Sequence, residues 1–391
     1  MNFLDKITLN PPVPLKKGIA YPFIEMANVG SYQREPENVD TKVYSSGSRF
    51  ADGDTIIARI TPCLQNGKGF YCHNIGEGFG STEFIVLRPK DQTVDSRYLY
   101  YLMQTNYIRE KMIKSMVGAS GRQRVNNDVF TSIDISFPKI EIQRRIADIL
   151  SAYDDLIENN RKQIKLLEEA AQRLYKEWFV DLRFPGYEHT KITDGVPEGW
   201  AKCSLGDVIE FDPKVQLAKD RVKQFVPMSA LSTSSMVLDM AEFRETTPNS
   251  GSKFQNDDTL LARITPCLEN GKTAFVHGIQ SPEGAVGSTE YIVMRSKRLN
   301  PYMVYLHART DGFRQSAINS MSGSDGRQRV KADKLQALPY LLPSATVVNQ
   351  FGQFAAHIFE LVFDLNEQTF QTAQARDRLL PKLMSGEVEV L

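Results

Sequence analysis

Cysteine is scarce in this sequence of 391 residues. Its four cysteines, Cys63, Cys72, Cys203 and Cys267, form no C-x-x-C pair and have no histidine pair nearby. This spacing excludes the common zinc sites. Disulfide frameworks are typical of small secreted proteins rather than chains of this size. We therefore expect reduced thiols and no metal site in this chain.

Net charge and long hydrophobic runs are also lacking. Lysine plus arginine equals aspartate plus glutamate, so no overall field attracts nucleic acid or a membrane, and any such binding must be local. The opening MNFLDKITLN has no apolar core of signal-peptide length, and no run reaches the roughly 18 apolar residues of a membrane span. These absences predict a cytoplasmic protein with no membrane partner.

Catalytic motifs are absent as well. The run Asn10-Pro11-Pro12-Val13 is similar to the N-P-P-aromatic motif of adenine methyltransferases, but it lacks the aromatic residue that stacks on a flipped base. The glycine-rich residues 76–80 are not followed by the Lys-Ser/Thr of a phosphate-binding loop. The five histidines are scattered. We predict no catalytic residue in this chain.

The sequence instead contains an internal repeat of two copies. Three blocks return almost unchanged: A-R-I-T-P-C-L-Q-N-G-K at 58–68 as A-R-I-T-P-C-L-E-N-G-K at 262–272, G-S-T-E-F-I-V at 80–86 as G-S-T-E-Y-I-V at 287–293, and G-R-Q-R-V at 121–125 and again at 326–330. The offset stays between about 202 and about 208 residues. The repeat therefore spans nearly the whole chain.

Each copy predicts a mixed α+β globule. Alternating segments at 55–60 and 259–264, and apolar runs at 83–87 and 290–294, are typical of strands. A helix is expected over 96–116 and over 301–321, the second with Asn300 as N-cap and Pro301 at its first position. Strand-like tails at 133–137 and 338–342 close the two copies.

A heptad pattern follows each globule. Apolar residues alternate three and four apart over 141–184 and again about 208 residues later, which predicts two long helices. Asn160 and Gln368 share one seam position, where a polar pair can fix the register, and Pro381 is expected to end the second seam. The predicted helix–helix seam consists of Ile146, Leu150, Ile157, Asn160, Ile164, Leu167 and Leu174 in the first helix and Phe354, Ile358, Leu361, Leu365, Gln368 and Leu379 in the second.

Chain connectivity constrains how these parts are arranged. A helix over 141–184 is about 60 Å long, so the second helix can pair with the first only by running back along it. We expect two globular domains, 1–140 and 185–346, separated by antiparallel coiled-coil helices at 141–184 and 347–391, with approximate twofold symmetry. Such a shape suits a twofold DNA target with two half-sites.

Local basic character favours nucleic-acid contact. The first copy has five basic residues and one acidic residue, Glu110, near its helix and the following loop: Arg109, Lys111, Lys114, Arg122 and Arg124 are the basic ones. The equivalent segment of the second copy also has an excess of basic residues. Such patches can neutralise phosphates, and an Arg-Gln-Arg loop can read guanine and adenine. The alternatives are a solvated basic loop and turns that merely build the globule. The candidate DNA-binding residues are Arg59, Thr61, Asn66, Lys68, Ser81, Thr82, Arg122, Gln123 and Arg124, with Arg263, Thr265, Asn270, Lys272, Ser288, Thr289, Arg327, Gln328 and Arg329 in the second copy.

Taken together, the chain resembles the specificity subunit of type I restriction-modification enzymes. The resemblance rests on the three repeated blocks, the long helix after each copy, the helix entry E-I-Q-R-R-I-A at 141–147 and V-P-E-G-W at 196–200. It implies a non-catalytic subunit whose two domains each read one part of a split DNA sequence, while the helices set the gap and dock two methyltransferase subunits. S-adenosylmethionine would be carried by those subunits, and ATP and magnesium by restriction subunits. A stand-alone DNA-modifying enzyme and a structural coiled-coil adaptor are the alternatives.

Overall fold

The computed structural model describes residues 2–324 and 326–390. The chain divides by its contacts into unit 1, Met1–Asn159 with Gln371–Leu391, and unit 2, Asn160–Phe370. Each unit has its own hydrophobic core. Each long helix contributes one segment to unit 1 and another to unit 2. Among the described residues, no helix has both the length and the apolar character needed to cross a bilayer.

Unit 1 is built on two sheets. An antiparallel sheet has the strand order β1-β8-β5-β6, and its central strands β5 and β8 are the apolar segments expected from the sequence. A second sheet, β3-β2-β7-β4, contains a parallel pair, β2 with β7. The bounds are β1 Ile7–Leu9, β2 Ala20–Ile24, β3 Asp40–Val43, β4 Ser48–Phe50, β5 Thr55–Ala58, β6 Gly69–Tyr71, β7 Gly78–Gly80, β8 Phe84–Pro89, β9 Met116–Val117 and β10 Arg124–Val125.

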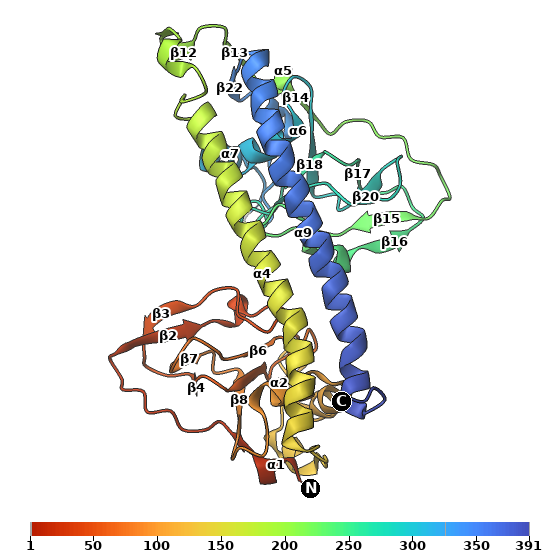
Figure 1. The fold of residues 1–391 in the computed structure, drawn as a ribbon. Helices are drawn as coiled ribbons and strands as arrows, with labels where there is room; N and C mark the ends of the chain where they lie inside the picture. The colour runs from red at the N-terminus through yellow and green to blue at the C-terminus, as the bar shows by residue number, and fades with distance from the viewer. Residues whose placement is uncertain (1, 325, 391) are drawn as a thin grey trace. The chain divides into compact units, whose positions relative to one another are not determined.

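Unit 2 repeats the strand order of both four-stranded sheets. The order β14-β21-β18-β19 matches the first sheet of unit 1, and β16-β15-β20-β17 matches the second, including its parallel pair. The bounds are β11 Ile192–Thr193, β12 Val196–Pro197, β13 Ala201–Ser204, β14 Ile209–Phe211, β15 Lys223–Val226, β16 Arg244–Thr246, β17 Ser252–Phe254, β18 Thr259–Ala262, β19 Thr273–Phe275, β20 Ala285–Gly287, β21 Tyr291–Ser296 and β22 Pro339–Leu342. Within unit 2, β18 and α6 lie nearer to α9 than the β15 sheet does (Figure 1).

The helix expected after each sheet is broken into two. Unit 1 has α2 Ser96–Gln104 and α3 Asn106–Lys114, and unit 2 has α6 Pro301–Ala308 and α7 Asp311–Asn319. The single-helix predictions are wrong because Thr105 and Thr310 adopt extended backbone angles and begin a new helix. Both hydroxyls also donate to a carbonyl three residues back, Thr105 Oγ1 to Leu102 O and Thr310 Oγ1 to His307 O. Asn300 caps α6 as predicted.

The tail at 133–137 is not a strand, which corrects the sequence prediction. In unit 1 this tail forms a single bridge, between Asp134 and Asn2. Its counterpart β22 forms because it pairs over four residues with β13. A strand needs a partner that satisfies its backbone groups, and that partner is only one residue long in unit 1. The short helices are α1 Phe3–Lys6, α5 Leu205–Val208 and α8 Ala332–Gln336.

Two long helices carry the heptad patterns, α4 Ile140–Phe179 and α9 Ala345–Ser385. Helix α4 ends five residues before residue 184. Helix α9 continues past Pro381, where the second seam was predicted to end. The reason lies in packing: Leu383 is buried in the core of unit 1 with Leu379 and Leu380 beside it, so the last turn is held although Pro381 lacks an N–H.

Within each unit the helix segments lie side by side and run antiparallel. In unit 1 Ile146 and Leu150 of α4 share a core with Leu383 of α9. In unit 2 Asn160 Nδ2 donates a hydrogen bond to Gln368 Oε1 at 2.8 Å, at the polar seam position. The other α4 seam residues are buried or half-buried in their own unit: Ile157, Ile164, Leu167 and Leu174.

The seam predicted on α9 is partly wrong. Phe354 and Leu361 are 57% and 46% exposed, although Phe354 touches Trp178 with ring centroids 6.0 Å apart. Ile358, Leu365 and Leu379 are half-buried. Helix α9 instead buries the neighbouring stripe Phe351, Ala355, Phe359 and Val362 against the globule of unit 2. Large aromatic side chains on that stripe bury more surface, so they determine which face turns inward.

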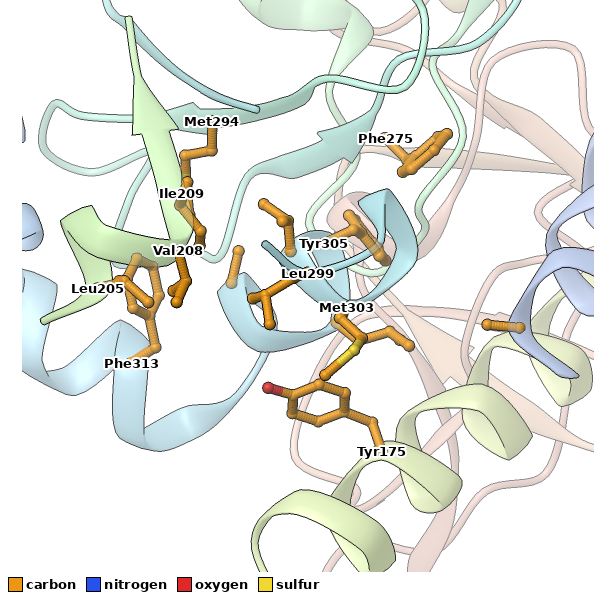
Figure 2. Close-up of a cluster of buried hydrophobic side chains, with 14 of the residues drawn as sticks. Tyr175, Leu205, Val208, Ile209, Phe275, Met294, Leu299, Met303, Tyr305 and Phe313 are labelled. Carbon is orange, nitrogen blue, oxygen red and sulfur yellow. The ribbon is translucent and has the colours of Figure 1, made fainter. Parts of the chain in front are cut away.

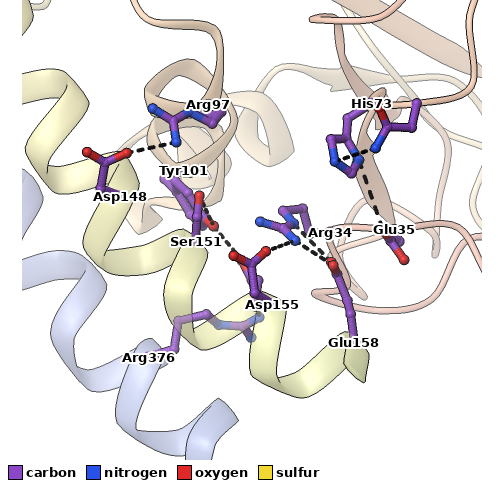
Figure 3. Close-up of polar contacts among 12 residues, drawn as sticks. Arg34, Glu35, His73, Arg97, Tyr101, Asp148, Ser151, Asp155, Glu158 and Arg376 are labelled. Carbon is purple, nitrogen blue, oxygen red and sulfur yellow. Dashed lines mark hydrogen bonds and ion pairs between the residues drawn. The ribbon is translucent and has the colours of Figure 1, made fainter. Parts of the chain in front are cut away.

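A polar network joins the globule of unit 1 to its helices (Figure 3). Arg34, from the loop after β2, donates from Nε to Glu158 Oε1 at 2.9 Å and from Nη2 to Asp155 Oδ1 at 2.6 Å. Tyr101 Oη of α2 donates to Asp154 Oδ2 at 2.6 Å, and Arg376 of α9 forms a buried ion pair with the same Asp154. Burial raises the pKa of Glu158 to about 7, although Arg34 opposes this shift.

In unit 2 an aromatic cluster joins the globule to the helices. Phe359 of α9 lies with its ring centroid 5.1 Å from Phe275 and 4.8 Å from Tyr302. Tyr175 of α4 points toward Met303 and Leu299 of the α6 region (Figure 2). Tyr175 Oη lies 3.2 Å from His307 Nδ1, and burial lowers the pKa of His307 to about 4. This interior is therefore largely apolar.

Candidate nucleic-acid interface

The three repeated blocks, far apart in the sequence, meet in space in unit 1. The backbone N–H of Arg59 donates to Glu83 O at 2.9 Å, joining the first block to the second. Thr61 N donates to Gln123 O, and Val125 N donates to Arg59 O, both at 2.9 Å, joining the first block to the third. We call this assembly of residues 58–68, 80–86 and 121–125 the block cluster of unit 1.

Unit 2 has the same assembly at 262–272, 287–293 and 326–330, the block cluster of unit 2. Arg263 N donates to Glu290 O at 3.0 Å, Thr265 N to Gln328 O at 3.1 Å, and Val330 N to Arg263 O at 3.0 Å. The repeated sequence blocks are thus joined by the same backbone hydrogen bonds in both units.

An ion pair fastens the third block to the second. Arg124 Nε lies 2.9 and 3.0 Å from the two carboxylate oxygens of Glu83, and Nη2 lies 2.6 Å from Oε1. Arg329 binds Glu290 in the same bidentate way, and its hydrogen bonds are the main cause that lowers the pKa of Glu290. Arg124 and Arg329, predicted as DNA contacts, are therefore engaged in holding the block clusters together.

Several other predicted contacts are also engaged. Lys68 Nζ donates to Met26 O at 3.0 Å, and Lys272 Nζ donates to Met228 O at 2.9 Å. Further candidates have partners within their own block cluster: Arg59 Nη2 donates to Val125 O, Thr61 Oγ1 donates to Gln123 O, Thr265 Oγ1 donates to Glu269 Oε1, and Ser81 and Ser288 accept from the backbone N–H of Glu83 and Glu290. Arg263 is half-buried. These side chains build the block clusters.

A matched set of side chains remains exposed in both units. Asn66, Thr82 and Arg122 in unit 1, and Asn270, Thr289 and Arg327 in unit 2, are exposed. In the part of the chain that the structure describes, their side chains form no hydrogen bond or ion pair. Gln123 and Gln328 are half-buried beside them. These are the predicted residues whose polar groups are available to a ligand.

The basic patch inferred from the sequence is smaller in space. Arg109 is 9% exposed and donates from Nη2 to the carbonyls of Leu64 and Gln65, at 3.1 and 3.0 Å. Lys114 pairs with Glu110 at 3.3 Å. Arg109 therefore supports the loop of the first block rather than offering its charge to a phosphate.

Sequence reasoning missed Tyr32, which lies against the block cluster of unit 1. Its backbone N–H donates to Gly67 O at 3.1 Å, and the guanidinium carbon of Arg109 lies 4.6 Å from its ring centroid. The available signal was a single aromatic residue in one copy, where the other copy has the serine-rich run 232–235.

Comparison with known proteins identifies similar chains. Residues 8–169 match the family model described as type I restriction modification DNA specificity domain. The type I restriction enzyme MjaIX specificity subunit of Methanocaldococcus jannaschii is 26% identical over 318 residues, covering 77% of this chain and 71% of the relative. The HindI specificity subunit of Haemophilus influenzae is 22% identical, covering 94% of this chain and 95% of the relative. Over most of its length the chain is similar to type I restriction enzyme specificity subunits.

As a specificity subunit, the chain provides DNA sequence specificity to a type I restriction-modification enzyme. The crystal structure of the type I restriction-modification S subunit from M. genitalium matches 98% of this chain and 95% of its own, with a TM-score of 0.54 and 15% identity. That likeness shows the shared fold, and the mixed α+β architecture with two long helices is thereby confirmed.

Proposed function

We propose that each unit of this specificity subunit reads one half of a bipartite double-stranded DNA target and that the chain itself is not catalytic. The observation that carries the proposal is the duplicated block cluster. Both units use the same backbone joints and the same ion pair, and both leave an asparagine, a threonine and an arginine exposed. Such groups bind phosphates and base edges.

In this proposal α4 and α9 set the unspecified gap between the half-sites and dock two methyltransferase subunits, with approximate twofold symmetry. The antiparallel packing inside each unit and the Asn160–Gln368 hydrogen bond support a fixed register. Phe354 and Leu361 leave apolar surface on α9, which suits a helical partner.

The partner chains would supply the chemistry. The methyltransferase subunits would carry S-adenosylmethionine and methylate adenine, and restriction subunits would use ATP and magnesium. The specificity subunit contributes position and sequence choice, so its cytoplasmic complex acts only where both units find their bases.

The test is to map methylated adenine across the genome of cells expressing the methyltransferase partner, with and without this chain. A split motif that appears only with the chain is the expected result, and it gives both half-sites and the gap. If the complex assembles and no new motif appears, the proposed function is wrong.

A further inference from the structure

The loop after β2 differs between the units at the place where it meets the block cluster. Two matching contacts align the loops: Tyr71 N donates to Arg34 O as Phe275 N donates to Met236 O, and Glu37 N donates to Asn28 O as Asp239 N donates to Ala230 O. With this alignment Tyr32 of unit 1 corresponds to Ser234 of unit 2. Both positions are exposed.

Tyr32 is held in place from several sides. Besides the bond from its N–H to Gly67 O, its hydroxyl accepts a hydrogen bond from Arg109 Nη1, and Ser31 forms a bridge with Lys68. A Cβ atom on Gly67 would lie 2.7 Å from the Tyr32 ring, so the glycine permits the ring to lie against the loop backbone. The ring is therefore fixed next to exposed Asn66.

The backbone of Tyr32 is also unusual. Its φ is +54°, in the left-handed region that bulky residues rarely adopt. Backbone strain of this kind persists where the surroundings enforce it, and such sites gather at ligand-binding positions. Despite these contacts, 42% of the tyrosine surface remains exposed, so the residue is accessible to a ligand.

From these observations we infer that Tyr32 is a specificity-determining residue of unit 1 and contacts the C5-methyl group of a thymine in the first half-site. This inference rests on the proposed function. Residues shared by both block clusters cannot distinguish two different half-sites, whereas Tyr32 and Ser234 can. In the major groove the thymine methyl is the apolar feature that an aromatic ring recognises. The short polar side chain of Ser234 offers no equivalent surface.

The experiment uses the specificity subunit assembled with its methyltransferase partner. Adenine methylation is measured on target duplexes in which each thymine of the half-sites is replaced, one at a time, by deoxyuracil, which lacks only the methyl group. With the unchanged protein, one replacement in the first half-site should lower the rate at limiting DNA by about fourfold, the factor expected for one methyl group.

Variants identify the residue responsible. In Tyr32→Ala the same replacement should have no further effect, and Tyr32→Phe, which keeps the ring but loses the hydroxyl, should retain the full sensitivity. Ser234→Ala is the matched control and should leave the first half-site unchanged. If Tyr32→Ala does not assemble, Tyr32→Ser, which places the residue of the aligned position 234 in unit 1, takes its place.

Three results would overturn the inference: a first half-site without thymine, no methyl-sensitive position in it, or a sensitivity that survives unchanged in Tyr32→Ala or Tyr32→Ser. A uniform loss of methylation in the variant, with base preference intact, would assign Tyr32 a supporting role only. Failure of the proposed function is distinguishable, because the unchanged complex would then show no split motif at all.

Discussion

The two units share topology and block clusters but differ in how the globule meets the helices. In unit 1 that junction is ionic, with Arg34, Glu158, Asp154 and Arg376 buried together. In unit 2 the positions 208 residues later are Val362, Phe363 and Asn366 in place of Asp154, Asp155 and Glu158, and the loop residue aligned with Arg34 is Met236. The same fold therefore tolerates opposite junction chemistry.

The difference separates two roles. An apolar junction stabilises by removing surface from water, and it requires no paired charges. A buried ionic junction gives less net stability because the charges must be desolvated, but each charge requires its partner. In unit 1 the position of the loop after β2 therefore depends, through Arg34, on specific acidic side chains of α4. In unit 2 the equivalent junction is held by aromatic packing.

The largest expected effect comes from breaking the ionic junction. Arg34→Met, which places the unit 2 residue in unit 1, should lower the free energy of unfolding of unit 1 by about 3–5 kcal/mol, because Glu158 is left buried without its partner. Native-state hydrogen exchange measures each unit separately.

A double variant provides the control for that change. Adding Glu158→Asn, the residue found at the equivalent position 366, should restore much of the loss, since no buried charge is then left unpaired and Asp155, which also loses Arg34, is exposed. Arg173→Ala, which removes an exposed pair with Glu169 at 3.5 Å, should cost less than about 1 kcal/mol. Equal losses in the single and double variants would show that the charges are not what matters.

Glu158 in unit 1 and His307 in unit 2 should contribute pH responses of opposite sign. The pKa of Glu158 is raised by burial from 4.5 to about 7, so between these values the folded state binds more protons than the unfolded state. Its contribution to stability is therefore largest below pH 4.5 and falls as pH rises to about 7. The pKa of His307 is lowered by burial from 6.5 to about 4, so its contribution instead rises with pH across that interval.

The measurement is hydrogen exchange between pH 4.5 and 7.5, each variant subtracted from the unchanged protein. The difference for Glu158→Gln in unit 1 should fall with rising pH, by on the order of 1–3 kcal/mol. The difference for His307→Gln in unit 2 should rise. Slopes of the same sign would mean that the two junctions respond alike.

Much of this architecture could be predicted because the sequence contains an internal repeat. The repeat located β5 and β18, and the heptads located α4 and α9. The breaks at Thr105 and Thr310 were missed because threonine has no strong helix-breaking signal; its capping role depends on local backbone geometry. The pair Arg34–Glu158 was missed because its partners are 124 residues apart. The ion pair of Arg124 with Glu83 did have a signal in the sequence, because Glu83 and Arg124 recur in the second copy as Glu290 and Arg329. A repeated acidic residue does not, however, show which basic residue it pairs with.

Substitutions of the exposed arginines that both block clusters share should have the smallest effect on stability and a clear effect on DNA binding. Arg122→Ala and Arg327→Ala should each weaken DNA binding by the assembled complex, by about 1–3 kcal/mol if the arginine contacts a base, while unfolding is unchanged because both side chains are exposed. If each arginine contacts a phosphate instead, the salt dependence of log Kd should fall by about one and base preference should persist.

Neighbouring arginines give the matched control. Arg124→Ala and Arg329→Ala remove the partners of Glu83 and Glu290, so they should loosen the block cluster, lowering its hydrogen-exchange protection, whereas Arg122→Ala and Arg327→Ala leave that protection intact. Affinity undiminished in Arg122→Ala would exclude its loop from the interface. Losses of different size in Arg122→Ala and Arg327→Ala would show that identical block clusters meet their half-sites differently, and would extend the contrast between the units from their junctions to their DNA contacts.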